Sequence, residues 1–419
     1  MRSFVCSLLL LLPLGGAAVA APTAPQQPLS LDQALAIAVS RAPMLDARRA
    51  QLEAARQESR RAGALPDPML TVGIENLPVT GDNAFDPAGD AMTMRRIGLR
   101  QEFPSGAERA ALRDLAERAV DERVALTRAE RLDVRRRTTE AWVALWAAQR
   151  ELVEVEALRE QAAVARELAH ARVSGGGETV SDALAASAAV LELDNRVEAA
   201  RAEVATAQIG LARWIGPGGP RVAAGVPDFS VLPVSEARLL GALDRLGPLL
   251  ATEAQVKTAA AAIDLAQADK RPDWSIAAAY GQRSDGRDDM LMVEVGIQLP
   301  LFAANRQDRG IAARRAEYDA VLAVREDARR EQAARIRADL ARWESLKQQV
   351  ARDRNALLPL AADRSATALA AYQGGAPIAT WLDARRDELA LLVDHTQRLE
   401  ALGRAWAGLA FLLAEEPEQ

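Results

Sequence analysis

One uninterrupted stretch of the chain constrains the fold more than any other feature. Residues 107–173 contain neither proline nor glycine, and apolar side chains such as Leu112 and Leu115 recur there at helical spacing. A single helix over this stretch would be roughly 100 Å long at about 1.5 Å per residue. Hydrophobic residues make up 49% of the chain and aromatic residues only 4%, a composition typical of long packed helices. The sequence therefore predicts a mainly α-helical protein.

The same pattern occurs twice, at an offset of about 200 residues. Each half has the order helix, strand, strand, very long helix, glycine turn and helix. The residues that mark the repeat are Pro66 and Pro272, Pro104 and Pro300, Trp142 and Trp343, and the glycine pairs Gly175, Gly176 and Gly374, Gly375. We expect a first repeat over residues 22–215, a connector rich in glycine and proline over 216–234, a second repeat over 235–414 and a tail over 415–419.

Start and stop signals set the expected limits of the helices. Ser30 and Gln33 have the spacing of a capping box, and Gly63 and Pro66 stop the first helix. Pro359 predicts a kink in the second very long helix. The expected helices are 30–62, 107–173, 179–214, 235–270, 309–373 and 378–413.

Residues 1–21 have the features of a secretory signal. A basic start at Arg2 precedes an apolar run and small residues at 18–20. The only cysteine, Cys6, lies in this segment, so the mature chain is expected to contain no disulfide. The longest later apolar run, 405–414, is about half the length that a membrane helix needs, so we expect any membrane span to consist of strands. The net charge of -6 is interleaved along the chain, which argues against nucleic acid as a partner.

Four segments alternate between apolar and other residues with a period of two, which indicates strands with one apolar face. They are residues 68–77, 93–103, 273–281 and 290–300. Each is about ten residues long, as a tilted membrane span requires. We expect Val293, Val295, Trp274 and Tyr280 to face lipid, and Glu75, Arg96, Arg100 and Glu294 to face a water-filled lumen. A soluble sheet packed on helices would give the same alternation, and that alternative stays open.

The number of strands has a consequence for assembly. Four strands cannot close a membrane barrel, since about eight is the minimum and an eight-stranded barrel is filled by its own side chains. Three chains would supply twelve strands and leave room for a pore. We therefore expect a homotrimer with a twelve-stranded barrel.

The sequence resembles the TolC-like outer-membrane efflux proteins over nearly the whole mature chain. The matching segments are LDQALA at 31–36, LPDP at 65–68, QLPLF at 298–302, YQGG at 372–375 and WLDA at 381–384. The resemblance implies a trimeric barrel in the bacterial outer membrane that continues into a helical periplasmic tunnel. It also implies a passive exit duct of a tripartite efflux system, with a periplasmic adaptor and an inner-membrane pump, of the resistance-nodulation-division type, as partners. The glycine turns would be the helix tips that contact the adaptor.

The same resemblance implies a gate at the periplasmic mouth. Asp383 matches an acidic position of that gate, Asp182 lies at the related place in the first repeat, and Tyr372 matches a tyrosine of the constriction. Thr380 and Pro377 depart from the family's best-known member, which has an aspartate and an arginine there. Both aspartates also suit the first turn of a helix, where the helix dipole favours negative charge, so a purely structural role stays open.

Five methionines, Met69, Met92, Met94, Met290 and Met292, gather at the predicted strands, and we expect all five on the lumen face. Thioethers bind soft ions such as Cu(I), and the stretches 74–78 and 92–96 resemble family members that accompany heavy-metal pumps. The alternative is that the methionines are adaptable packing residues near a barrel rim.

Catalytic and cofactor motifs are not found in the sequence. The two histidines, His170 and His395, lie far apart and begin no zinc or acid/base motif, and there is no phosphate loop or nucleophile elbow. We expect neither an enzyme nor a cofactor. A periplasmic helical adaptor and a coiled-coil scaffold are the competing functions, and the cargo of a channel (metal ion, drug or secreted protein) is open.

Overall fold

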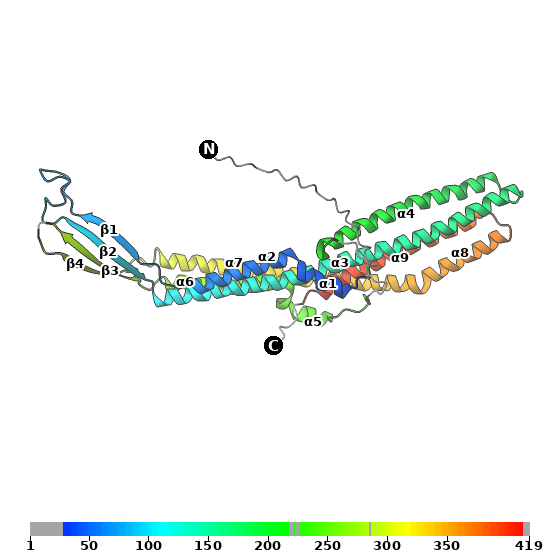
Figure 1. The fold of residues 1–419 in the computed structure, drawn as a ribbon. Coiled ribbons are helices and arrows are strands. Elements are labelled where there is room, and N and C mark those ends of the chain that lie inside the picture. The colour runs from blue at the N-terminus through cyan, green and yellow to red at the C-terminus, as the bar shows by residue number, and fades with distance from the viewer. Residues whose placement is uncertain (1–27, 218–221, 223–226, 285, 414–419) are drawn as a thin grey trace, which may run out of the picture.

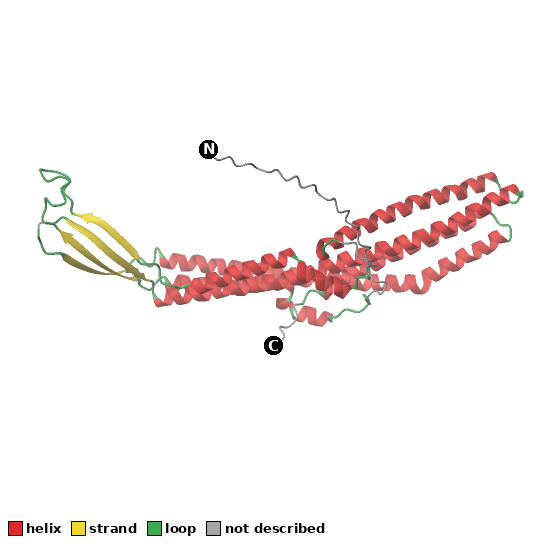
Figure 2. Cartoon of the chain, in the orientation of Figure 1, coloured by secondary structure: helices red, strands yellow, loops and turns green. Residues whose placement is uncertain are grey.

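The computed structural model describes residues 28–217, 222, 227–284 and 286–413 as an elongated molecule (Figure 1). A sheet lies at one end and helices fill the rest of the length. The other end is formed by the two short turns that connect pairs of long helices (Figure 2). The expected secretory signal at 1–21, part of the connector and the tail at 415–419 lie outside the described residues.

Both halves follow the order helix, strand, strand, long helix and helix, but their helices are divided differently. The first half contains α1 (Leu31–Arg41), α2 (Pro43–Arg61), β1 (Met69–Glu75), β2 (Met94–Phe103), α3 (Gly106–Ser174) and α4 (Val180–Ile215). The second half contains α5 (Glu236–Gly241), η1 (Leu243–Arg245), α6 (Gly247–Ala268), β3 (Trp274–Arg283), β4 (Met290–Ile297), α7 (Gln307–Arg352), η2 (Asp353–Leu357), α8 (Leu358–Gln373) and α9 (Ile378–Ala410). The predicted mainly α fold with a duplicated helix-strand-strand-helix-helix order is confirmed.

Two helices expected to be continuous are broken, and those predictions were wrong. The expected helix 30–62 is α1 and α2, separated at Ala42, because Pro43 begins a new helix and forces its neighbour into extended backbone. The expected helix 235–270 is α5, η1 and α6, with Pro248 in the first turn of α6. The expected kink at Pro359 is a π-helical segment, η2, that begins six residues earlier. The prolines lie at the breaks, but their positions in the sequence did not show into how many helices each segment divides.

The four strands form one antiparallel sheet in the order β1, β2, β3, β4. Their register places Val72 opposite Ile97, Ile97 opposite Tyr280, and Tyr280 opposite Leu291, so one row of apolar side chains crosses all four strands. β3 continues to Arg283 and β4 ends at Ile297, so the predicted ends at 281 and 300 are displaced. β1 and β4 are the edges of the sheet.

The main core lies in the middle of the molecule, where α1, α3, α4, α7 and α9 meet. The two tryptophans that marked the duplication have equivalent contacts there. The indole Nε1 of Trp142 donates to the Leu29 carbonyl at 3.1 Å, and that of Trp343 donates to the Phe229 carbonyl at 2.9 Å. Each indole therefore holds the segment that leads into the first helix of its own repeat.

Smaller alanine-rich clusters continue along the helical hairpins. They include Ala165, Ala169 and Ala186 near the tips and Ala162 further in. Small side chains let helix backbones approach closely, which explains why alanine is so common in this chain. Among the described helices, none is both long enough and apolar enough for a membrane crossing.

Replacing Trp343 with Phe should lower the free energy of unfolding by about 1–3 kcal/mol, because the buried Phe229 carbonyl loses its donor. Trp406 is a matched control, since its indole also donates to a connector carbonyl, that of Val231, but at an exposed site where water can replace it. Denaturant unfolding of the purified variants measures the difference. Equal losses for Trp343→Phe and Trp406→Phe would contradict the anchoring role.

Candidate functional site

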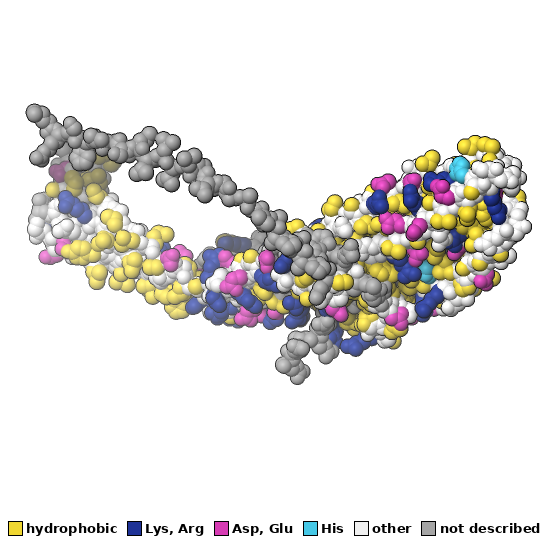
Figure 3. Space-filling view, turned by 45° about the vertical axis from the view of Figure 1, so that its right-hand side comes forward, with side chains coloured by type: hydrophobic (Ala, Val, Ile, Leu, Met, Phe, Trp, Pro, Cys, Tyr) yellow, Lys and Arg dark blue, Asp and Glu magenta, His cyan; other side chains and the backbone are white. Residues whose placement is uncertain are grey.

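One face of the sheet is apolar and uncovered. The residues Val72 and Val293 are 76% and 68% exposed, and Leu291, Val295 and Ile97 are also exposed. Hydrophobic side chains gather over this end of the molecule in Figure 3. A contiguous apolar surface of this kind marks a region that contacts a partner or a membrane.

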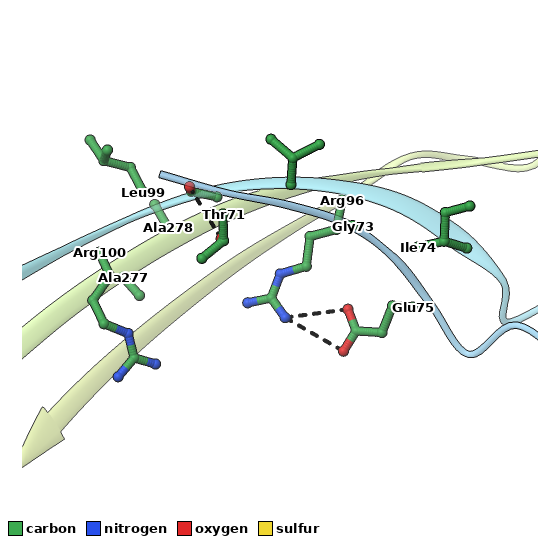
Figure 4. Close-up of a pocket in the computed structure, with 11 residues that line it drawn as sticks. Thr71, Gly73, Ile74, Glu75, Arg96, Leu99, Arg100, Ala277 and Ala278 are labelled. Atoms are coloured by element: carbon green, nitrogen blue, oxygen red, sulfur yellow. Dashed lines mark hydrogen bonds and ion pairs between the residues drawn. The ribbon is translucent and has the colours of Figure 1, made fainter. Parts of the chain in front are cut away.

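The other face carries paired charges. Arg96 Nη1 lies 3.3 Å from a carboxylate oxygen of Glu75, and Arg100 Nη2 lies 3.3 Å from Glu294 Oε1. Figure 4 shows Glu75, Arg96 and Arg100 on one side of the sheet and Leu99 on the opposite side. All four side chains are partly exposed, so each pair is hydrated and contributes little to stability. The four residues expected at a lumen thus share one face.

Small residues make room beneath these charged side chains. A Cβ atom on Gly98 would lie 2.9 Å from Thr71 Oγ1, and one on Gly296 would lie 2.6 Å from Ser275 Oγ. The result is a hollow of about 410 Å³ lined by Thr71, Glu75, Arg96, Arg100 and Ala277, among others. This face therefore carries long polar side chains over a surface of glycine, alanine and serine.

The aromatic residues expected at the two ends of the membrane span lie at opposite ends of the apolar face. Trp274 is opposite Phe103 and Ile297, next to the helices. Tyr280 lies toward the far loop, and its hydroxyl donates to the Asp289 carboxylate. The apolar band thus ends in an aromatic side chain on each side.

The methionines do not form one group. Met94 is 5% exposed, and its sulfur would lie 2.6 Å from a Cβ on Gly281, with Met292 Cε 3.3 Å from the same point. Met290 is the register partner of Gly281. Met69 lies on the same face but near the helical end, opposite Arg100, and Met92 precedes β2, so no strand register places it on either face. The described residues contain no group of three or more His, Cys, Asp or Glu that could hold a metal ion.

The two glycine turns at the helical tips have similar geometry. The amides of Gly175 and Gly177 donate to the Arg172 carbonyl, and the amide of Ala376 donates to the Ala371 carbonyl five residues back, as Gly177 does. Gly176 and Gly375 have positive φ angles of 73° and 104°, which glycine adopts without strain. The residue before each of them is the C-cap of the preceding helix, α3 or α8, so the two turns correspond position by position.

A set of contacts, which we name the tip latch, joins the two turns. It consists of Arg172, Glu178, Tyr372 and the Ile378 amide. Glu178 accepts from the Tyr372 hydroxyl and from the Ile378 amide, both at 3.3 Å. Arg172 donates to the Tyr372 carbonyl at 2.9 Å, and its guanidinium lies 4.2 Å from the centre of the Tyr372 ring.

The electrostatics of the tip latch keep Tyr372 a donor. Burial of the ring, followed by the negative charge of Glu178, raises the pKa of the Tyr372 hydroxyl above its ordinary value. The hydroxyl therefore stays protonated at neutral pH and can donate to Glu178. Tyr372 is 2% exposed, so this contact lies inside the joined tips.

The two candidate gate aspartates lie outside the tip latch. Asp182 is the N3 residue of a capping box, where its carboxylate accepts from the backbone amide and hydroxyl of Thr179. Asp383 has a side chain that is 66% exposed and lies 3.6 Å from Arg386. The structure therefore does not bring either aspartate together with Tyr372 within one chain.

Sequence reasoning missed Glu178 and Arg172. A signal was present in Pro377, which is the N-cap residue of α9 and has no side-chain acceptor for the first amides of that helix. The first amides of α9 therefore need an acceptor from outside the cap, and Glu178, the first residue after the other glycine turn, supplies one to Ile378.

The comparisons with known proteins agree with this geometry. Residues 34–217 match a family model described as "Outer membrane efflux protein". No curated protein matches the sequence.

Solved structures extend the similarity to nearly the whole chain. CusC, described in a study of transmembrane channel formation, is 17% identical with a TM-score of 0.77, and 91% of each chain is covered. The outer membrane protein VceC from Vibrio cholerae is 19% identical with a TM-score of 0.71, over 92% of this chain and 97% of that one. The MtrE outer membrane channel from Neisseria gonorrhoeae is 17% identical with a TM-score of 0.74, over 91% and 88%. At these identities the structures show a common fold.

Glu178→Ala should weaken the start of α9, because the buried Ile378 amide loses its acceptor at a cost of about 1–2 kcal/mol. Hydrogen exchange at residues 378–380 should become about tenfold faster, since about 1.4 kcal/mol corresponds to that factor. Glu167→Ala, which removes an exposed carboxylate that pairs with Arg166, is the control. Unchanged exchange in Glu178→Ala would mean that water replaces the carboxylate at no cost.

Proposed function

We propose that this chain is a member of the outer membrane efflux protein family, whose model matches residues 34–217, and that it conducts cargo passively through the outer membrane as the exit duct of a tripartite efflux system. The observation that carries the proposal is the two-faced sheet. Its uncovered apolar face, with Val72 and Val293 at its centre, suits contact with lipid. Its opposite face, with the Glu75–Arg96 and Arg100–Glu294 pairs, suits a water-filled lumen.

The assembly that follows is a homotrimer. β1 and β4 are unpaired edges in one chain, and an edge exposed to lipid would leave backbone groups without hydrogen bonds. Pairing β4 of one chain with β1 of the next, three times, closes twelve strands around an open lumen. The helices of the three chains then continue the lumen as a tunnel on the periplasmic side.

The partners follow from the position of the tips. The turns at Gly175, Gly176, Gly374 and Gly375 lie at the end of the molecule farthest from the sheet (Figure 1), where they are accessible to a periplasmic adaptor. An inner-membrane pump, of the resistance-nodulation-division type, would supply the energy, so this chain needs neither a catalytic site nor a cofactor. A periplasmic adaptor or a soluble scaffold would have no use for an uncovered apolar sheet face, which is why we favour the channel.

The mouth of the tunnel would be gated at the tips. Around a threefold axis, three copies of Asp383 would form an acidic ring, while Tyr372 holds the two hairpins of each chain together through the tip latch. Asp182, at the related place in the first repeat, is a further candidate for this ring. Its part in a capping box supports a structural role at the same time.

One class of cargo has support on the lumen face. Met94 and Met292 lie together over Gly281, and thioether sulfurs bind soft cations such as Cu(I). Soft metal cations are therefore a candidate cargo.

Val293→Arg should impair assembly in the membrane, because a charged side chain near the middle of the lipid face costs about 2–4 kcal/mol. Glu294→Gln, one residue away on the opposite face, should assemble like the wild type, since it removes only a hydrated ion pair. The fraction of trimer in the outer-membrane fraction is the measurement. Equal assembly of both variants would overturn the assignment of faces, and with it the proposed channel.

Asp383→Ala should raise the resting conductance of the trimer, or weaken its block by divalent cations, because it removes the acidic ring. Asp387→Ala is the control, since Asp387 lies one turn further along α9 and pairs with Arg364 at 2.7 Å. Single-channel recording in a planar bilayer, with cation added at the periplasmic side, measures both properties. If Asp383→Ala changes neither, Asp383 serves only the start of α9.

A further inference from the structure

The second very long helix is broken where the first is continuous. α7 ends at Arg352, and the amide of Leu358 donates to the Asp353 carbonyl five residues back, which is the hydrogen bond of a π-helical turn. Pro359 follows in the first turn of α8 and has no amide to donate. α3 has no such break in the first repeat. Ten residues after Trp142 stands Leu152, whereas ten residues after Trp343 stands Asp353.

Asp353 is a buried carboxylate tied to another helix. Its side chain is 3% exposed, and Oδ2 accepts from Arg398 Nη1 at 2.8 Å. His395 Nδ1, one turn earlier on α9, lies 3.4 Å from the same oxygen, and the His395 side chain is 7% exposed. We name Asp353, His395 and Arg398 the bend cluster. Because a buried charge is costly unless it is paired, these contacts strongly favour one placement of the π-helical turn on α9.

The charges around His395 favour its neutral form. Burial lowers the pKa of His395, and the positive charges of Arg150 on α3 and Arg398 on α9 lower it further, whereas Asp353 opposes this shift. Asp394, also on α9, pairs with the outer side of Arg398 at 3.4 Å. At neutral pH the bend cluster is therefore one ion pair, Asp353 with Arg398, supported by a neutral imidazole.

A small change of helix direction at the bend cluster would produce a large displacement at the tips. The arm from Leu358 to Tyr372 is roughly 20 Å long at about 1.5 Å per residue. A change of about 10° in the direction of α8 at η2 would move Tyr372 by roughly 3.5 Å, and a hydrogen bond does not survive such a displacement. The hydroxyl of Tyr372 contacts Glu178 at 3.3 Å, so the tip latch forms only when α8 has the right direction.

We infer that Asp353 is a positioning residue for the periplasmic mouth: through Arg398 and His395 it fixes the π-helical bend, and thereby the direction in which α8 delivers Tyr372 to the tip latch. The meaning of this bend for gating rests on the proposed function, but the bend itself does not. The direction of α8 in the second hairpin thus depends on the ion pair between Asp353 and Arg398. The continuous helix α3 of the first hairpin has no such bend.

Acid should weaken the bend cluster. Because the pKa of His395 is lower in the folded protein than the ordinary value of about 6.5, its contribution to stability is complete above about pH 6.5 and is lost as the pH falls below it. Protonation then places a third positive charge beside Arg150 and Arg398, with one carboxylate to balance them within the cluster.

Hydrogen exchange of the detergent-solubilised full chain tests the inference. Asp353→Asn should make exchange at residues 358–373 at least tenfold faster and leave α3 residues 110–130 unchanged. Asp394→Asn, which removes the exposed partner of the same arginine, should change neither. Equal exchange at 358–373 in Asp353→Asn and the wild type, or an equal increase along α3, would overturn the positioning role.

A second arm uses pH and applies even if Asp353→Asn does not fold. After correction for intrinsic rates, wild-type exchange at 358–373 should become at least threefold faster between pH 7.5 and 5.5, and His395→Gln should abolish that dependence. A pH response that persists in His395→Gln would overturn the part assigned to His395. Neither arm measures conduction, so failure of the inference and failure of the proposed channel function are distinguishable.

Discussion

A four-stranded sheet with an uncovered apolar face and two unpaired edges cannot be the final state of this chain. The edges β1 and β4 need backbone partners, and the row of side chains from Val72 to Leu291 needs an apolar neighbour. In the proposed trimer one arrangement meets both needs, because closure pairs the edges and lipid covers the face. In that trimer, closure would also define the threefold axis, and the axis would determine which parts of the distant helical tips meet. The chemistry of the proposed mouth would therefore depend on the register of the strands at the opposite end of the molecule.

The two repeats share a framework and differ where a moving part would be useful. Trp142 and Trp343 make equivalent hydrogen bonds in the core, and the glycine turns share two of their amide contacts. The differences are local: Glu178 precedes α4 where Pro377 precedes α9, and Asp353 stands in a break of the second long helix. The first hairpin thus supplies the charged groups of the tip latch, Arg172 and Glu178. The second hairpin contains the bend that positions Tyr372 against them.

The sequence was sufficient to predict the features that depend on local periodicity. The alternation around Val293 predicted both the strand and its two faces, and the absence of proline and glycine from 107 to 173 predicted α3 nearly to its ends. The breaks at Ala42 and before α6 were missed because proline fits the first turn of a helix as well as it ends one. The spacing of apolar residues does not show whether a proline begins a helix or ends one.

Contacts between distant segments could not be predicted for a different reason. Glu178 and Ile378 are 200 residues apart, and no spacing rule connects them. Asp182 shows the converse, since its local capping contact was predictable while any role at a mouth requires the other two chains.

The energies of the two regions indicate where the molecule can move. The tip latch consists of three hydrogen bonds and one cation–π contact, each worth about 1 kcal/mol, so its opening costs only a few kcal/mol per chain. The core around Trp142, Leu145 and Leu211 is fully buried, and loss of a single large side chain there costs about 2–5 kcal/mol. A partner that binds the tips can therefore supply enough energy to open the latch without disturbing the core. We expect motion to concentrate between the π-helical bend and the tips. The strongly packed core ends there, and the weaker contacts of the tip latch can be replaced by contacts with a bound partner.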